Sequence, residues 1–196
     1  MNLNEVKHVL TISMEDLRLR KPKDYEAFEK ILISIVGISS PNKTISLGKN
    51  LTKKIFEYDN ELNIVLVGHL YLEKYLNDIL GKNLKGFETL EKKGILNSFY
   101  KKVTYLQAEK ITPSDLLDNI ITYNKLRNKF AHKLNYDIIE FDIFEFGYLK
   151  RYQSEFKVKR KKEKRILYRI FIRLITYHIM VMLTRSHNYL FLLDEE

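Results

Sequence analysis

Apolar residues recur every three or four positions along most of the chain, and this spacing predicts α-helices. In residues 22–37 the repeat follows Pro22, which suits the first turn of a helix. Ser39-Ser40-Pro41-Asn42 breaks the pattern, so we expect a loop over residues 39–50. Residues 1–20 fit either a short helix or a strand.

A long helix is predicted from about residue 51 to residue 80, with Gly81 at its end. One stripe of its second half carries Leu62, Leu66, His69, Glu73, Leu76 and Leu80. On this stripe His69 is either a core or interface histidine or a support for a nearby site. Glu73 needs a partner among the leucines, and an arginine of a functional site would serve. The alternative for Glu73 is a structural role elsewhere.

Residues 87–107 predict a third helix, which Gly94 weakens by roughly 1 kcal/mol relative to Ala. Its lysines are interpreted as a solvated face: Lys92, Lys93, Lys101 and Lys102. Residues 133–150 mix aromatic and acidic residues without one clear period. We expect a loop followed by a short helix there.

The fourth helix has the strongest start signal in the chain. Thr112 is a good N-cap, Pro113 fits the first helical position, and Asp115 favours the positive end of the helix dipole. Its apolar stripe is Leu116, Ile120 and Tyr123. Arg127 continues the stripe, and a buried, unpaired arginine is costly. We therefore expect Arg127 to line a cleft or to pair with a carboxylate.

The last helix is predicted from about residue 165 to residue 190, after a dense basic run at 157–165. Its arginines at intervals of four either contact RNA phosphates or form a solvated face, and both interpretations stay open. The candidate RNA-binding residues are Lys159, Arg160, Lys161, Lys162, Arg165, Arg169 and Arg173. Because charged residues interrupt the apolar stretch 166–183, we interpret it as an amphipathic helix that does not span a membrane.

Composition agrees with an all-α bundle of about five to six helices, since seven Gly and three Pro are few for a turn-rich sheet protein. We expect one domain over residues 1–196. Its parts are an N-terminal extension and first helix (1–48), a central core (49–150), and a basic segment with the C-terminal helix (151–196). The chain has no Cys, which suits a reducing cytoplasm, and its five His lack metal-ligand spacing. No metal or cofactor is therefore expected.

The formal net charge of +9 indicates a polyanionic partner, and an acidic membrane surface is the second option. The alternative to a polyanionic partner is a soluble protein that is simply rich in lysine, because Lys is spread along most of the chain.

The segment 124–132 combines the side chains that RNA cleavage without a metal requires. His132 could move a proton near neutral pH, Arg127 could hold two phosphate oxygens, and Asn128 could bind a phosphate or fix the imidazole tautomer. On an ideal helix Arg127 and His132 point about 140° apart. Either the helix breaks near Ala131, or the arginine reaches round, or the working partners come from two chains. One His supplies one proton transfer, and a two-fold dimer would supply the second.

Leu126-Arg127-Asn128-Lys129-Phe130-Ala131-His132 resembles the signature of the HEPN superfamily, an all-α family with an Arg-x4–6-His motif. The upstream segment 69–76 resembles a helix of its mannitol-repressor-like branches. The resemblance covers about residues 60–135. It implies a metal-independent endoribonuclease that acts as a homodimer, as in toxin–antitoxin and abortive-infection systems, with Arg127 and His132 as the catalytic pair and Asn128 as their polar companion. It also implies a cognate antitoxin or regulatory protein as a possible partner.

One departure concerns a tyrosine that the nucleotidyltransferase-partnered toxin branch carries two residues after the histidine. Here Leu134 stands at that position, and Tyr136 follows two residues later. Two other functions stay open. One is a non-catalytic HEPN regulator or nucleic-acid-binding module, since some family members act so. The other is a helical membrane-surface or partner-binding protein, based on residues 157–185.

Overall fold

The computed structural model describes residues 60–154, 156 and 160–186, with side chains described up to residue 183. The elements predicted within residues 1–59, the end of the last helix and Lys159 lie outside this part of the chain. In order, the described elements are α4 (Glu61–Asn83), α5 (Phe87–Lys92), α6 (Phe99–Ala108), α7 (Ser114–His132), the 3-10 helices η1 (Ile138–Glu140) and η2 (Ile143–Glu145), α8 (Gly147–Lys150) and α9 (Lys161–Ser186). No strand occurs among these residues, so the all-α prediction is confirmed.

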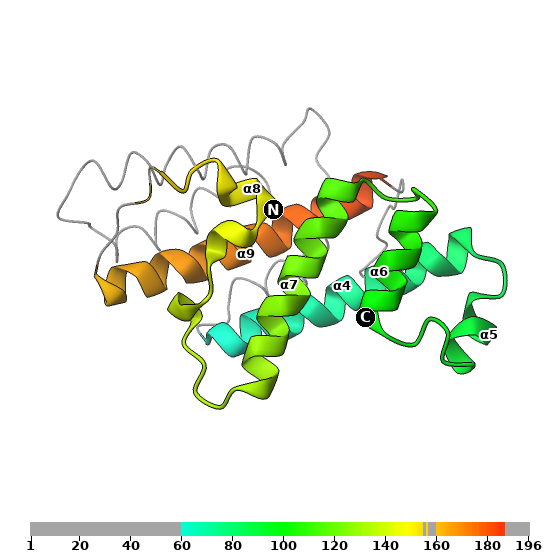
Figure 1. Ribbon diagram of the computed structural model, residues 1–196, viewed down its shortest axis with the longest axis horizontal. Helices are drawn as coiled ribbons and strands as arrows, with labels where there is room; N and C mark the ends of the chain where they lie inside the picture. Colours follow the sequence, from blue (N-terminus) through cyan, green and yellow to red (C-terminus); the bar gives the residue numbers. More distant parts are fainter. Residues whose placement is uncertain (1–59, 155, 157–159, 187–196) are drawn as a thin grey trace, which may run out of the picture.

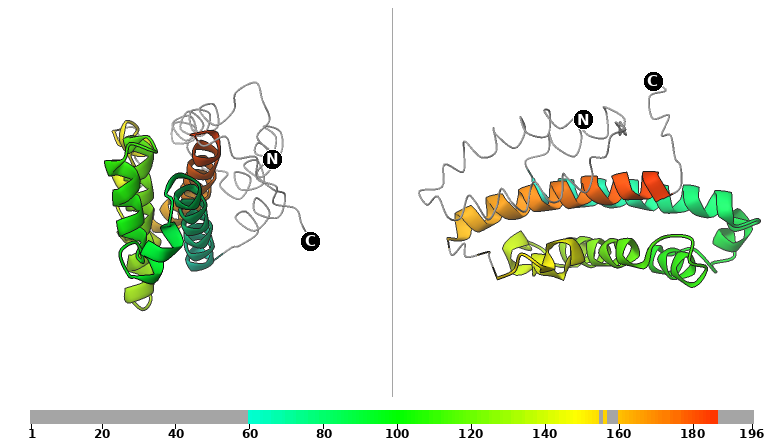
Figure 2. Two further views of the ribbon diagram at one scale, coloured as in Figure 1. Left: turned by 90° about the vertical axis from the view of Figure 1, so that its right-hand side faces the viewer. Right: turned by 90° about the horizontal axis from the view of Figure 1, so that it is seen from above.

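The helices form two layers (Figures 1 and 2). The long helices α4 and α9 lie in one layer, and α6, α7 and α8 cover one side of it. Helix α7 crosses α4 and α9, so the helix that carries the Arg-Asn-His motif packs on both long helices.

The two layers are in close contact at Gly68 of α4, which faces Tyr123 of α7 and, within its own layer, Thr176 of α9. Tyr123 and Thr176 are fully buried. The Tyr123 hydroxyl donates to the carbonyl of Ile64 at 3.4 Å and lies 2.8 Å from Thr176 Oγ1. A glycine is needed here because a Cβ at position 68 would lie 2.2 Å from the Tyr123 hydroxyl oxygen.

Helix α4 differs from its prediction at both ends. It begins at Glu61 because the Asn60 side chain caps it, accepting from the Leu62 N–H at 2.8 Å. It passes through Gly81 and ends at Asn83. A start near residue 51 and a stop at Gly81 were therefore wrong.

The predicted helix over residues 87–107 is in fact two helices, α5 and α6. Gly94 takes φ +77°, which ends α5 instead of merely weakening a longer helix. Ser98 then starts α6 by accepting from the Lys101 N–H. At α7 the N-cap is Pro113, one residue after the predicted Thr112, which is buried.

The later elements agree better with the sequence. Residues 133–150 hold two 3-10 turns and then the short helix α8, as expected. By length and composition, α9 is the one described helix that could cross a membrane over Lys161–Leu183. Since 78% of its most apolar window is buried against the rest of the protein, packing in the core explains that composition.

Candidate functional site

Arg127, Asn128 and His132 all belong to α7, which continues through His132 before Lys133 closes it with a backbone bond to the Lys129 carbonyl. The helix therefore does not break near Ala131, and one of the three explanations for the Arg-to-His spacing is excluded. The full helical register applies to the motif.

That register points His132 away from the bundle. His132 comes nine residues after the fully buried Tyr123, which places it about 180° round the helix from the core side, and its side chain is exposed. Arg127 stands on the core side and is half-buried. Within one chain, the guanidinium and the imidazole therefore point in different directions.

Arg127 donates from Nη1 to the Asn128 side-chain oxygen at 3.1 Å. No carboxylate of the described residues lies within ion-pair distance of it. A half-buried guanidinium with one neutral partner keeps most of its fork of donors for a ligand. Arg127 and Asn128 thus form a hydrogen-bonded pair whose remaining donors could bind an anion.

His69 lies on the neighbouring face of α4 and is buried. Its Nε2 bonds the side-chain oxygen of Asn124 at 3.0 Å, and its ring stacks on Phe99 with centroids 4.4 Å apart. Because the amide oxygen only accepts, Nε2 carries the proton. Burial lowers the pKa of His69; the Asn124 bond and Glu73 act against this, while the charge of Arg127 adds to it. His69 is therefore a neutral donor that fixes Asn124.

His69 was predicted as a support for the site, whereas Asn124 was not predicted to take part in it. Asn124 is three residues before Arg127 and four before Asn128, so it shares their side of α7. The spacing of these three polar residues was the available signal. The pairing of Asn124 with His69 of α4 had no such signal, because it depends on how α4 and α7 cross.

Glu73 pairs with Lys102 of α6 at 3.8 Å and not with Arg127. Lys102 is buried and also bonds Glu91 at 2.7 Å. Glu73 thus ties α4 to α6, which is the structural alternative that the sequence left open. Its charge still acts on His69.

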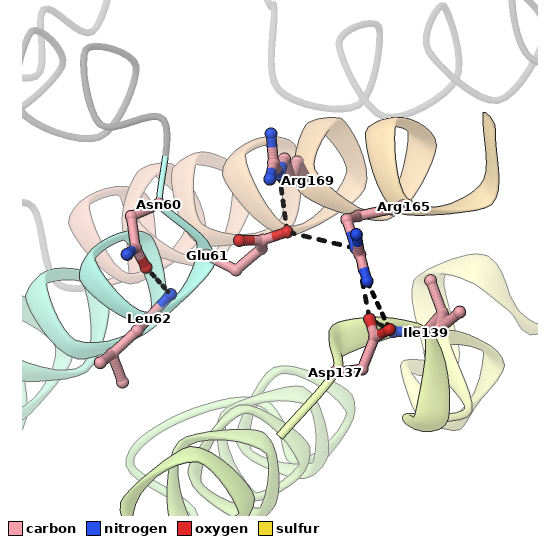
Figure 3. Close-up of polar contacts among 7 residues, drawn as sticks. All are labelled: Asn60, Glu61, Leu62, Asp137, Ile139, Arg165 and Arg169. Atoms are coloured by element: carbon pink, nitrogen blue, oxygen red, sulfur yellow. Dashed lines mark hydrogen bonds and ion pairs between the residues drawn. The ribbon is translucent and has the colours of Figure 1, made fainter. Parts of the chain in front are cut away.

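Two arginines of the basic row on α9 are engaged within the chain (Figure 3). Arg169 bonds Glu61 at 2.7 Å, and Arg165 bonds Asp137 and approaches Glu61 at 3.9 Å. Burial raises the pKa of the Asp137 carboxyl, but bonds from Arg165 and from a backbone N–H outweigh it, so the pKa is lowered. The network joins α9 to the start of α4 and to the segment after α7.

The remaining predicted RNA-binding residues differ in their surroundings. Arg173 is 8% exposed. Arg160 pairs with Glu163 at 3.1 Å, while Lys161 and Lys162 are exposed. RNA contact by this group stays a prediction, and the engagement of Arg165 and Arg169 by carboxylates favours a structural role for those two.

Comparison of the chain with protein-family models, with curated proteins and with solved structures gives no match.

Proposed function

We propose that this protein is a metal-independent endoribonuclease whose active site forms where two copies of α7 meet. The observation that carries the proposal is the end of α7: a half-buried Arg127 that is hydrogen-bonded to Asn128 and lacks a carboxylate partner among the described residues, followed by an exposed His132. The resemblance of residues 126–132 to HEPN ribonucleases and the net charge of +9 add to it.

In this mechanism Arg127 holds two oxygens of the scissile phosphate and stabilises the charge of the five-coordinate phosphorus. His132 takes the proton of the 2′-hydroxyl, whose oxygen forms a bond to phosphorus. The bond from phosphorus to the 5′-oxygen breaks, and His132 of the partner subunit donates a proton to that oxygen. The products are a 2′,3′-cyclic phosphate and a 5′-hydroxyl.

A second copy is part of the proposal because of the orientation of the motif. Arg127 and His132 diverge by about 140° within one α7, and only one histidine stands in the motif. Leu134, two residues beyond His132, is 92% exposed, so apolar surface is available for association beside the imidazole.

The first test is incubation of the purified full chain with single-stranded RNA in EDTA. Wild-type protein should cut, leaving 2′,3′-cyclic phosphate ends, and His132→Ala and Arg127→Ala should lose at least about 100-fold in rate. Lys150→Ala, on the exposed side of α8, is the control and should cut normally. Cleavage by His132→Ala at the wild-type rate would reject the proposal.

The second test asks whether the site needs two copies. Wild-type and His132→Ala chains are mixed in equal amounts and allowed to exchange subunits, so that about a quarter of the dimers are fully wild type. A shared site then gives about half the activity that the same amount of wild-type protein gives alone. Undiminished activity would place the site within one chain.

The divergence of Arg127 and His132 also favours a second candidate, a non-catalytic nucleic-acid-binding regulator. This candidate needs no composite site. It predicts RNA binding that His132→Ala does not change, with no cleavage. Production in cells separates the two further, because a toxin or abortive-infection effector of the cytoplasm should arrest growth, and His132→Ala or a cognate antitoxin should relieve the arrest.

A further inference from the structure

The segment between α5 and α6, which we call the α5–α6 turn (residues 92–101), is bridged by its own polar bonds. Lys101 Nζ donates to the Gly94 carbonyl at 2.8 Å and to the Asn97 side-chain oxygen at 3.1 Å. Gly94 has φ +77° and Ser98 caps α6. Lys101 therefore shapes the turn.

The turn presents an aromatic ring and an aliphatic side chain to solvent. Tyr100 is 61% exposed and Ile95 is 54% exposed. The Lys101 bond to the Gly94 carbonyl joins the first turn of α6, which contains Tyr100, to the residue that follows Lys92 and Lys93. An exposed tyrosine next to cations is the combination on which unpaired bases stack.

The charge of this region is strongly positive. Residues 82–102 hold six lysines against two glutamates, and Glu91 is engaged by the buried Lys102. Lys92 and Lys93 are exposed, and no carboxylate of the described chain lies within ion-pair distance of either. They are available to bind phosphates, unlike Arg165 and Arg169.

The α5–α6 turn is also anchored beside the motif helix. Phe99, the residue before Tyr100, stacks on His69, and His69 bonds Asn124 of α7. Helix α6 lies next to α7 on the same side of α4 (Figure 1). An extended strand that passes Arg127 could therefore continue over the turn.

We propose that the α5–α6 turn is a binding surface for single-stranded RNA, in which Tyr100 stacks on an unpaired base and Lys92 and Lys93 contact the backbone phosphates. This assignment rests on the proposed ribonuclease function. It adds the path of the RNA strand across the protein and a reason for the preference for unpaired RNA. It also changes the interpretation of these lysines, which the sequence alone presented as a solvated face.

The test measures binding in the full chain carrying His132→Ala, so that the RNA stays intact. The probe is a fluorescein-labelled oligouridylate of about 12 nucleotides, followed by anisotropy over a series of salt concentrations. Tyr100→Ala should weaken binding about tenfold, whereas Tyr100→Phe, which keeps the ring, should bind nearly as tightly. The double substitution Lys92→Gln and Lys93→Gln should flatten the plot of log K against log[salt] by about 1.4. Lys150→Gln is the matched control, because Lys150 is the exposed last residue of α8, which lies well away from α5 (Figure 1).

An RNA duplex of the same length should compete poorly, since its bases are already stacked. Unchanged binding by Tyr100→Ala, or a salt slope that Lys92→Gln and Lys93→Gln do not alter, would overturn the assignment, as would equal affinity for the duplex. The nuclease proposal is judged separately, by cleavage with His132 intact. A protein that cuts RNA but binds it equally well without Tyr100 refutes only the assignment of the turn, and one that binds through Tyr100 but never cuts refutes only the nuclease.

Discussion

The close packing of α4, α7 and α9 at Gly68 predicts that Gly68→Ala lowers the free energy of unfolding. A Cβ at position 68 would lie 2.2 Å from Tyr123 Oη and 2.9 Å from Thr176 Cγ2. The first separation is at least about 1 Å short of van der Waals contact. Because the Tyr123 ring is fully buried, it cannot swing into solvent, and the methyl group must push α7 or α9 away from α4.

Several effects set the size of the change in Gly68→Ala. Overpacking a core costs about 1–3 kcal/mol, and displacing the buried Tyr123 hydroxyl from its bonds costs about 1–3 kcal/mol more. Alanine returns about 1 kcal/mol through its higher helix propensity. We expect a net loss of about 2–4 kcal/mol in the free energy of unfolding, which corresponds to a drop of roughly 1 M in the urea midpoint.

Gly81→Ala is the matched control because it lies in the same helix, where a Cβ would meet nothing within 4 Å. It should raise the free energy of unfolding by up to about 1 kcal/mol and the urea midpoint slightly. In Gly68→Ala with Tyr123→Phe, removal of the hydroxyl oxygen should recover part of the loss. If Gly68→Ala were as stable as Gly81→Ala, the close approach of α4 and α7 would be wrong.

Three further predictions concern charged and titratable groups, each followed by urea unfolding. The folded-state pKa of His69 is lowered, so the unfolded chain binds more protons and the free energy of unfolding should fall as pH drops through about 6.5. In His69→Gln the fall between about pH 7.5 and 5.5 should be smaller, and an equal fall would contradict the lowered pKa of His69. Glu61→Gln should lower the free energy of unfolding by about 1–2 kcal/mol, because it leaves two arginines without their shared carboxylate. Glu163→Gln should lower it by at most about 0.5 kcal/mol, and equal losses in the two variants would refute the stabilising role of Glu61. Lys102→Met should stay within about 1.5 kcal/mol of wild type, since its two carboxylates are partly solvated, and Lys102→Ala should lose about 2 kcal/mol or more through the missing stem.

Helical spacing was enough to predict the class of fold and most of the described helices. The errors fell where local backbone geometry decides. Gly94 had been weighed as a residue with low helix propensity, whereas its left-handed conformation separates α5 from α6. Gly81 was given the stop signal, yet α4 continues through it to Asn83, whose side-chain amide donates to the Ile79 carbonyl.

The residues of the candidate site were found in the sequence, but their mutual arrangement was not. Arg127 and His132 follow from register, and the structure keeps that register to the end of α7. The link from His69 to Asn124 joins residues 55 positions apart and depends on the crossing of two helices. In the same way, the engagement of Arg169 by Glu61, 108 positions away, could not be inferred from a row of arginines on one helix.

These pairings bear on which chemistry the protein can perform. Arg165 and Arg169 of α9 are paired with carboxylates, whereas Lys161 and Lys162 of the same helix are exposed. The cations that we propose for RNA are therefore Arg127 and the exposed lysines of the α5–α6 turn. His132 points away from the core side of α7, where Arg127 stands. In the proposed mechanism the imidazole that meets a phosphate held by Arg127 therefore comes from a second copy. Substitution of Tyr100 should then change the affinity for RNA but leave the dependence of activity on the fraction of His132→Ala chains unaltered. If Tyr100→Ala altered that dependence instead, the turn would belong to the contact between subunits and not to the path of the RNA.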